Sequence, residues 1–253
     1  MRASNFVRPL KSYSPLLMAT LALVGGCVGE PDPHDMYGQC IQVTDLANGT
    51  VKVDLPAAPS GDEQIGVTHQ ALNADLGSLW QTKQIPVCWE ASTWTDSAED
   101  QNMREVVRQA IEDTWTATFA KAAAQLHEEP ITFTGWDKCT ASGALDSIRI
   151  SVDDSANNPH TSALGRRIKG LPGGMVLNFT YKNWSPVCGT NQATREYCTY
   201  AIAVHEFGHA LGFAHEQNRS DRPASCTDAP QGSDGDVYYG QWDVESVMDY
   251  CNP

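Results

Sequence analysis

Apolar residues recur at helical spacing through the middle of the chain. No glycine or proline interrupts residues 97–129, and six residues recur there at helical spacing, mostly three or four positions apart: Met103, Val107, Ala110, Ile111, Thr114 and Thr118. This period places them on one face, so the segment from Ser97 to Glu129 is predicted to form one long amphipathic helix. We interpret Trp115 and Phe119 within it as core anchors.

Short runs of branched and aromatic residues predict strands on either side of this helix. They are Ile85 to Trp89, Ile131 to Phe133, Ser147 to Val152 and Met175 to Phe179. In the third run Ile148, Ile150 and Val152 alternate onto one face, as strand geometry requires. A second helix is expected from about Ala193. This order indicates an α+β domain, in which a backing helix and a second helix lie against a twisted, mainly parallel sheet.

The first 27 residues have the pattern of a leader. They contain three basic residues and no acidic one, and an apolar run from Leu16 to Val24 precedes Gly25-Gly26-Cys27. The run is far shorter than the roughly 20 residues of a membrane-spanning helix, so we interpret residues 1–27 as an export signal. Small residues directly before Cys27 resemble the lipobox of bacterial lipoproteins, which predicts a lipid anchor on that cysteine, with simple secretion as the alternative.

The composition changes at about residue 80. Residues 28–79 are rich in proline, glycine, aspartate and alanine and lack sustained periodicity, which is typical of a tether or pro-segment. The folded domain is therefore expected to cover residues 80–253. A chain of 253 residues has room for one domain of this size and no second large one.

Eight cysteines in an exported chain predict disulfides. If Cys27 carries lipid, seven remain, and Cys40 is the expected unpaired one because it lies alone in the N-terminal extension. Proximity along the chain favours three pairs among the others, although fifteen pairings are formally possible. The favoured pairs are Cys188 with Cys198, Cys226 with Cys251, and Cys88 with Cys139.

The chain is strongly acidic. Its formal net charge is −14, and removal of Arg2, Arg8 and Lys11 with the leader would make it −17. Such a surface repels phosphate backbones, so we expect no nucleic-acid partner, and contact with a membrane only through a lipid at Cys27. We expect a monomer.

The second helix contains a metal-binding pattern. Four positions separate His205 from His209, so both imidazoles project from one helix face, one turn apart, at a distance suited to a shared metal ion. Glu206 lies one position further round the helix. It can therefore reach a water on the metal without occupying a coordination position.

A third histidine follows the helix. Gly212 can adopt a positive φ, which would end the helix and turn the chain back so that His215 reaches the same metal. Three nitrogen donors and one water form the open tetrahedral site of catalytic zinc, whereas structural zinc is held by four protein ligands. We predict a catalytic Zn²⁺ bound by His205, His209 and His215.

The extended pattern HExxHxxGxxH, followed by Ser246-Val247-Met248-Asp249-Tyr250 as a methionine turn, resembles the metzincin metallopeptidases. Within that clan the astacin family is most similar, because Glu216 directly follows His215, residues 219–222 continue the match, and Tyr250 lies two residues after Met248. The resemblance implies a metzincin-like zincin domain with a small C-terminal lobe. It also implies that Met248 packs beneath the zinc, and that Tyr250 ligates the metal or moves away to stabilise the oxyanion.

Two features bear on how far this resemblance extends. The sequence ends three residues after Tyr250, where the family continues into a closing helix. Either the C-terminal lobe is minimal and fastened by Cys226 and Cys251, or the sequence is truncated. Glu216 has two interpretations: the family uses this glutamate to receive the N-terminus freed by pro-segment removal, and the alternative is an ordinary surface glutamate.

The predicted reaction is peptide-bond hydrolysis. Zinc acidifies its bound water and polarises the scissile carbonyl, while Glu206 takes the water proton and passes it to the leaving amine. The protein or peptide substrate is expected to lie extended along a sheet edge, for which Met175 to Phe179 is the candidate. Two alternatives remain: a zinc hydrolase directed at peptidoglycan, and a catalytically silent zinc-binding surface module.

Overall fold

The structure is a computed structural model and describes residues 42–45, 51–54, 72–155 and 159–251. The predicted leader, Cys27, Cys40 and most of residues 28–79 lie outside the described residues. The strands are β1 (Gln42–Asp45), β2 (Val51–Asp54), β3 (Leu72–Ala74), β4 (Gln84–Trp89), β5 (Thr132–Lys138), β6 (Ile148–Val152), β7 (His160–Thr161), β8 (Met175–Leu177), β9 (Phe213–Ala214) and β10 (Val237–Tyr239). The α-helices are α2 (Ala98–Ile111), α3 (Ala117–Leu126) and α4 (Gln192–Leu211).

The long helix forms in the expected place. Ser97 caps its N-terminus, because the Ser97 side chain accepts a hydrogen bond from the Asp100 N–H at 3.1 Å. A π-helical turn at Glu112–Thr116 joins α2 to α3, and the helix ends at Leu126, where His127 adopts a φ of 55°. The π-helical turn contains buried Trp115, whose indole N–H donates to the Val204 carbonyl at 2.9 Å. Trp115 therefore ties this helix to α4.

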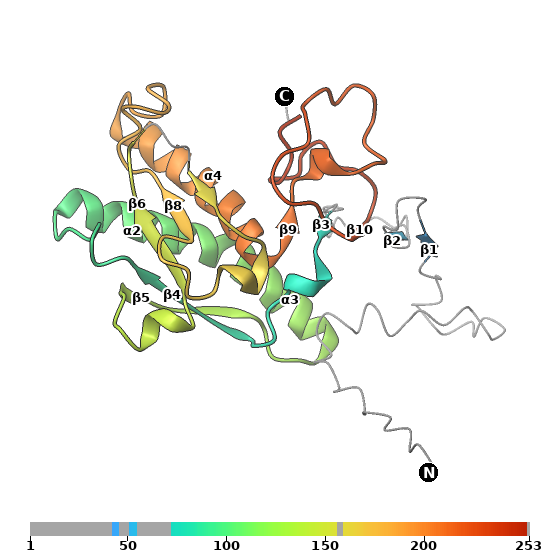
Figure 1. Cartoon of the computed structure of the whole chain (residues 1–253), viewed down its shortest axis with the longest axis horizontal. Coiled ribbons are helices and arrows are strands. Elements are labelled where there is room, and N and C mark those ends of the chain that lie inside the picture. The colour runs from blue at the N-terminus through green and yellow to red at the C-terminus, as the bar shows by residue number, and fades with distance from the viewer. Residues whose placement is uncertain (1–41, 46–50, 55–71, 156–158, 252–253) are drawn as a thin grey trace, which may run out of the picture. The chain divides into compact units, whose positions relative to one another are not determined.

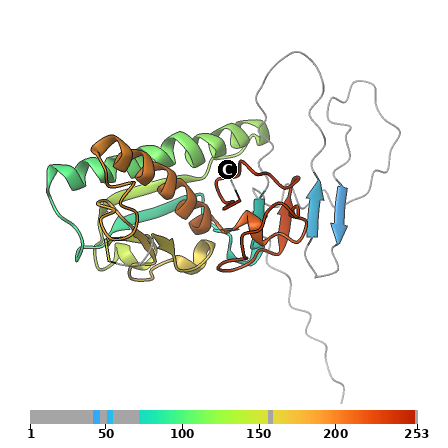
Figure 2. The ribbon, with the colours of Figure 1, turned by 90° about the horizontal axis from the view of Figure 1, so that it is seen from above.

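The first of two five-stranded sheets has the order β5-β4-β6-β8-β7. Its strands are parallel except for β7, which pairs with β8 in the antiparallel direction. Figures 1 and 2 show α2 and α4 on the same side of this sheet, and the two helices contact each other. The predicted α+β domain with a mainly parallel sheet is therefore confirmed.

The core lies between the sheet and these helices. Ile85, Ile148 and Ile150 are fully buried on the strands, as is Phe207 on α4. Phe207 meets Phe133 edge to face, with 5.2 Å between ring centroids. Burial of one such side chain contributes about 1.5–3 kcal/mol, so this packing holds α4 against the sheet.

One expectation about the sheet is wrong. Met175 to Phe179 was the candidate edge, but β8 lies between β6 and β7 and has partners on both sides. The edge strand here is β7, only two residues long, in the polar loop after β6. Two residues cannot display an alternating pattern, so the sequence carried no signal for this strand.

The second sheet was not expected from the sequence. Its order is β1-β2-β10-β3-β9, and β3 pairs with β9 through Asn73 with Ala214 and Ala74 with Phe213. The Asn73 side chain also donates to the His215 carbonyl at 3.1 Å. Residues before Trp80 therefore contact the segment that contains the third histidine.

The structure contains the three predicted disulfides. They join Cys88 to Cys139, Cys188 to Cys198 and Cys226 to Cys251. The last pair fastens the end of the chain to the loop after α4. Among the described helices, none combines the length and the apolar character that a membrane span requires.

Candidate metal centre

Helix α4 and the turn after it position the histidines. Asn191 caps the helix by accepting a hydrogen bond from the Thr194 N–H at 3.0 Å, and every residue from Ala203 to Leu211 is buried. The helix ends at Gly212, whose φ of 110° lies in the left-handed region that favours glycine. The chain then runs through β9 and reaches His215.

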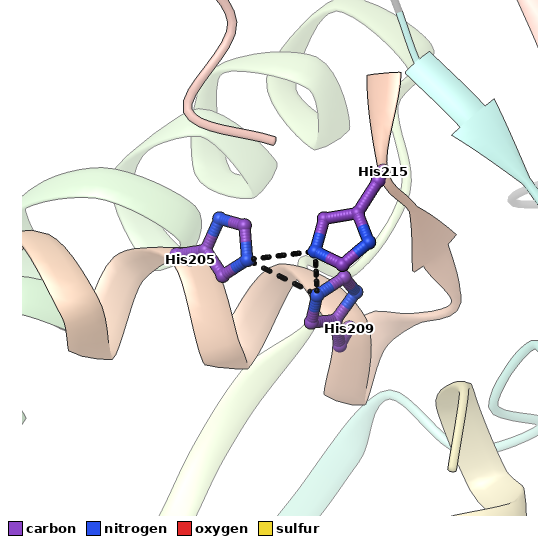
Figure 3. A group of neighbouring side chains, drawn as sticks. All are labelled: His205, His209 and His215. Atoms are coloured by element: carbon purple, nitrogen blue, oxygen red, sulfur yellow. Dashed lines mark hydrogen bonds between the residues drawn. The ribbon is translucent and has the colours of Figure 1, made fainter. Parts of the chain in front are cut away.

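The three histidine side chains converge as the spacing predicted. Figure 3 shows His205 and His209 projecting from α4 toward His215, which comes from the segment after β9. Their Nε2 atoms are 3.1 Å apart for His205 and His209, 3.1 Å for His209 and His215, and 3.3 Å for His205 and His215. The Nε2 atoms therefore form a nearly equilateral triangle.

Backbone carbonyls hold each ring in this orientation. The Nδ1 atom of His205 lies 2.7 Å from the Val247 carbonyl oxygen, that of His209 lies 2.7 Å from the Phe213 carbonyl oxygen, and that of His215 lies 3.0 Å from the Gln231 carbonyl oxygen. A carbonyl can only accept, so in each ring Nδ1 carries the proton and Nε2 has a free lone pair. The sequence analysis did not identify any of these three carbonyl groups as a partner of a histidine.

The histidines are neutral at physiological pH. Burial, together with the neighbouring imidazole rings, lowers the pKa of His205 to about 4 and that of His209 to about 3. Burial also lowers the pKa of His215. Three unprotonated imidazoles are available as ligands, and this is the form that binds a metal ion.

The triangle fits zinc. Zinc-to-nitrogen bonds of 2.0–2.1 Å in a tetrahedral arrangement separate the nitrogens by about 3.3 Å, close to the separations found here. A second group of close metal-binding side chains in the described residues comprises Cys226, Asp249 and Cys251. The two cysteines are joined as a disulfide, so they offer no thiolate to a metal.

Glu206 lies beside the histidines with an unpaired carboxylate oxygen. Its side chain is buried, and its Oε2 makes no hydrogen bond to any described residue. Burial raises the pKa of Glu206 to about 7. A buried carboxylate oxygen without a partner is costly, so its presence indicates a function at this position.

The methionine turn packs under the helix. Met248 is buried, and a Cβ placed on Gly208 would lie only 2.3 Å from the Met248 sulfur. Only glycine at position 208 allows this approach. The Met248 carbonyl accepts a hydrogen bond from the Glu216 N–H at 2.8 Å, which fixes the turn next to His215.

Tyr250 lies against the rings of His205 and His215. Its hydroxyl oxygen lies 3.4 Å from the His205 Nε2, and its ring stacks on the His205 ring with 5.3 Å between centroids. Tyr250 is 45% exposed. The disulfide from Cys251 to Cys226 anchors the residue that follows Tyr250.

Glu216 is not a surface residue. Its side chain is fully buried, and Oε1 lies 3.2 Å from the Arg219 guanidinium, which is also fully buried. The interpretation as an ordinary surface glutamate is therefore wrong. Burial raises the pKa of Glu216 to about 8, against the opposing effect of Arg219.

Comparison with known proteins finds a family similar to this segment. Residues 194–228 match the peptidase family described as Astacin, which confirms the astacin-like resemblance over α4, the turn and His215. The similarity to this peptidase family is thus limited to the segment that contains the three histidines and Glu206.

Two solved structures are also similar. They are titled "Structure of myroilysin" and "Crystal structure of myroilysin", and each shares 16% identity with this chain at a TM-score of 0.41. The first alignment covers 71% of this chain and 82% of that one, and the second covers 78% and 84%. The sequence matches no curated protein.

Proposed function

We propose that this chain is an exported, astacin-like zinc-dependent endopeptidase, with His205, His209 and His215 as the metal ligands and Glu206 as the general base. The convergence of three Nε2 lone pairs within 3.3 Å of one another, beside a buried carboxylate oxygen with no described partner, carries this proposal. Three neutral donors leave one tetrahedral position open, which is the arrangement of catalytic rather than structural zinc.

Glu206 and Tyr250 would have separate roles in peptide hydrolysis. A bound zinc ion would supply Lewis acidity, polarising the scissile carbonyl and making a coordinated water more acidic. Glu206 would accept the water proton at Oε2 and deliver it to the leaving amine nitrogen. The Tyr250 hydroxyl, 3.4 Å from the His205 Nε2, would donate a hydrogen bond to the developing oxyanion.

An extended peptide would bind along the outer edge of β7. That strand borders α4, and the Thr161 hydroxyl donates to the Glu206 backbone carbonyl at 3.0 Å. A substrate that pairs with this edge would therefore lie beside the general base, because one residue joins the strand to the active-site helix. In strand addition, main-chain hydrogen bonds supply the affinity.

Two alternative functions are tested together with this one. Purified protein should hydrolyse casein in a zinc-dependent manner and leave peptidoglycan sacculi intact. Release of wall peptides from sacculi, without casein cleavage, would favour the peptidoglycan hydrolase. Zinc binding without hydrolysis of either material would favour the silent surface module, although such a module has no need of a carboxylate at position 206.

Tyr250→Phe should retain zinc and lose activity in part. A single oxyanion donor contributes about 3–4 kcal/mol to transition-state stabilisation, and the phenyl ring preserves the stacking on His205. A phosphinic peptide that mimics the tetrahedral intermediate should bind this variant more weakly than the wild type. Equal inhibitor affinity in both proteins would show that the hydroxyl has no such role, and Tyr197→Phe on the exposed part of α4 is the matched control.

We also propose export with a lipid on Cys27, monomeric behaviour and no nucleic-acid partner. The apolar run before Gly25-Gly26-Cys27 and the acidic net charge of −14 support these proposals. Mass spectrometry of the mature N-terminus tests the anchor. An acylated cysteine is expected, and an unmodified N-terminus beyond residue 27 would contradict it.

A further inference from the structure

Three tryptophans surround a hollow beside the first half of α2. Its volume is about 340 Å³, and it is lined by Trp89 at the end of β4, Trp94 in the following loop and Trp136 on β5, together with polar side chains of α2 and β5. None of its lining residues belongs to the histidine site. The volume lies at the lower end of the range for small-molecule sites.

The backbone of β5 deviates from regular geometry to present Trp136. Val87 pairs with Gly135 and Cys88 with Asp137, so Trp136 is the extra residue of a β-bulge. Its φ of 68° lies in the left-handed region, which a bulky side chain rarely adopts. The ring stacks on Phe207 at 5.6 Å between centroids and remains partly exposed. Strain of this kind is typical of functional positions.

Both arginines of the hollow already have partners. Arg108 bonds to Glu105 and Glu112, whereas Arg104 lies 3.8 Å from the centroid of the Trp94 ring and donates to the Thr95 carbonyl. Neither guanidinium is free to bind an anion. A cationic ligand is also disfavoured, because Arg104 already occupies a face of Trp94.

The groups that remain available suit a neutral, hydroxylated ligand. Asp137 accepts no side-chain hydrogen bond from a described residue, and the Gln101 amide uses only its nitrogen, which donates to the Asp96 carbonyl. These carboxylate and amide oxygens are acceptors, and the indole N–H of partly exposed Trp136 is a donor. The two arginines among the lining residues balance Glu105 and Asp137, so the formal charge of the lining is zero.

We infer that this hollow binds a neutral pyranose ring, which packs against the indole of Trp136 and hydrogen-bonds through its hydroxyls to Asp137 and Gln101. The flat C–H face of a sugar matches an indole, and its hydroxyls both donate and accept. The site would hold a glycan while leaving the histidine centre open. The inference is independent of the zinc chemistry.

Saturation-transfer NMR and calorimetry on the full chain test the site with maltotriose, cellotriose and tri-N-acetylchitotriose. At least one should bind with a Kd of about 0.1–10 mM, in the range of weak small-ligand affinities. Gln101→Ala and Asp137→Ala should each weaken binding by about tenfold, and both leave the stacking of Trp136 on Phe207 in place. Gln109→Ala, on the same helix but outside the hollow, should bind as the wild type does.

Casein hydrolysis by Gln101→Ala should equal that of the wild type, so this test and the test of the peptidase can fail separately. Three outcomes would overturn the inference. They are the absence of binding by all three sugars to folded protein, unchanged affinity in both variants, and binding of adenosine or hexaglutamate at the hollow in preference to the sugars.

Discussion

Glu206→Gln should abolish nearly all peptide hydrolysis while the protein keeps its zinc and its fold. The side chain is a buried carboxylate that directly follows His205, and Oε2 has no partner among the described residues. An amide has the same shape but cannot accept the proton at any pH. General acid-base groups typically contribute about 10²- to 10⁴-fold in rate, and we expect kcat to decrease by a factor in that range.

The zinc content of Glu206→Gln distinguishes loss of the general base from loss of the metal. Glu206 is not one of the three nitrogen donors, so elemental analysis should find the same zinc stoichiometry as in the wild type. Glu196→Gln is the matched control, because Glu196 lies on the same helix and interacts only with polar neighbours such as Gln192 and Asn102. Retention of more than about a tenth of the wild-type kcat by Glu206→Gln would contradict its role as general base.

His209→Ala should lose the metal altogether. His209 provides the Nε2 that lies 3.1 Å from both other histidine nitrogens, so its removal leaves two donors and opens one side of the site. Catalytic zinc sites use three protein ligands, and two imidazoles hold zinc too weakly to survive dialysis. We expect one zinc per wild-type chain, and close to none in the variant, by elemental analysis after chelator-free purification.

Thermal unfolding gives a second measurement of the same loss. A metal that binds only the folded protein stabilises it by about 4 kcal/mol at a thousand times its Kd, so a chelator should lower the wild-type Tm. The Tm of His209→Ala should not respond to the chelator. His127→Asn is the control, because His127 is exposed, lies at the end of α3 and has a left-handed φ of 55° that asparagine tolerates. Full zinc content in His209→Ala would refute the three-histidine site.

Local patterns account for what was predicted correctly. The spacing of His205 and His209 determines their common helix face, whatever the rest of the fold, and Gly212 supplies the φ of 110° that the turn to His215 needs. The long helix from Ser97 follows from an uninterrupted periodic segment with a capping serine. The three disulfides join cysteines that were neighbours in chain order.

The wrong and missing predictions concern contacts between distant segments. Met175 to Phe179 has the composition of a strand, but composition does not reveal that β7 pairs with it and takes the edge position. Glutamate is a residue type that usually lies at the surface, yet Glu216 is enclosed by Arg219 and the methionine turn. The bulge that presents Trp136 arises from the pairing of β5 with β4 and has no local signature.

The sequence by itself therefore determined the helix that carries His205, Glu206 and His209 and the turn that brings back His215, because these depend on spacing within a short segment. Only the tertiary structure decided which backbone carbonyls orient the rings. Val247, Phe213 and Gln231 serve as acceptors through a group that every residue possesses, so no residue type could mark them. Their selection depends on how the chain folds back over the site, and that depends on packing between segments far apart in sequence.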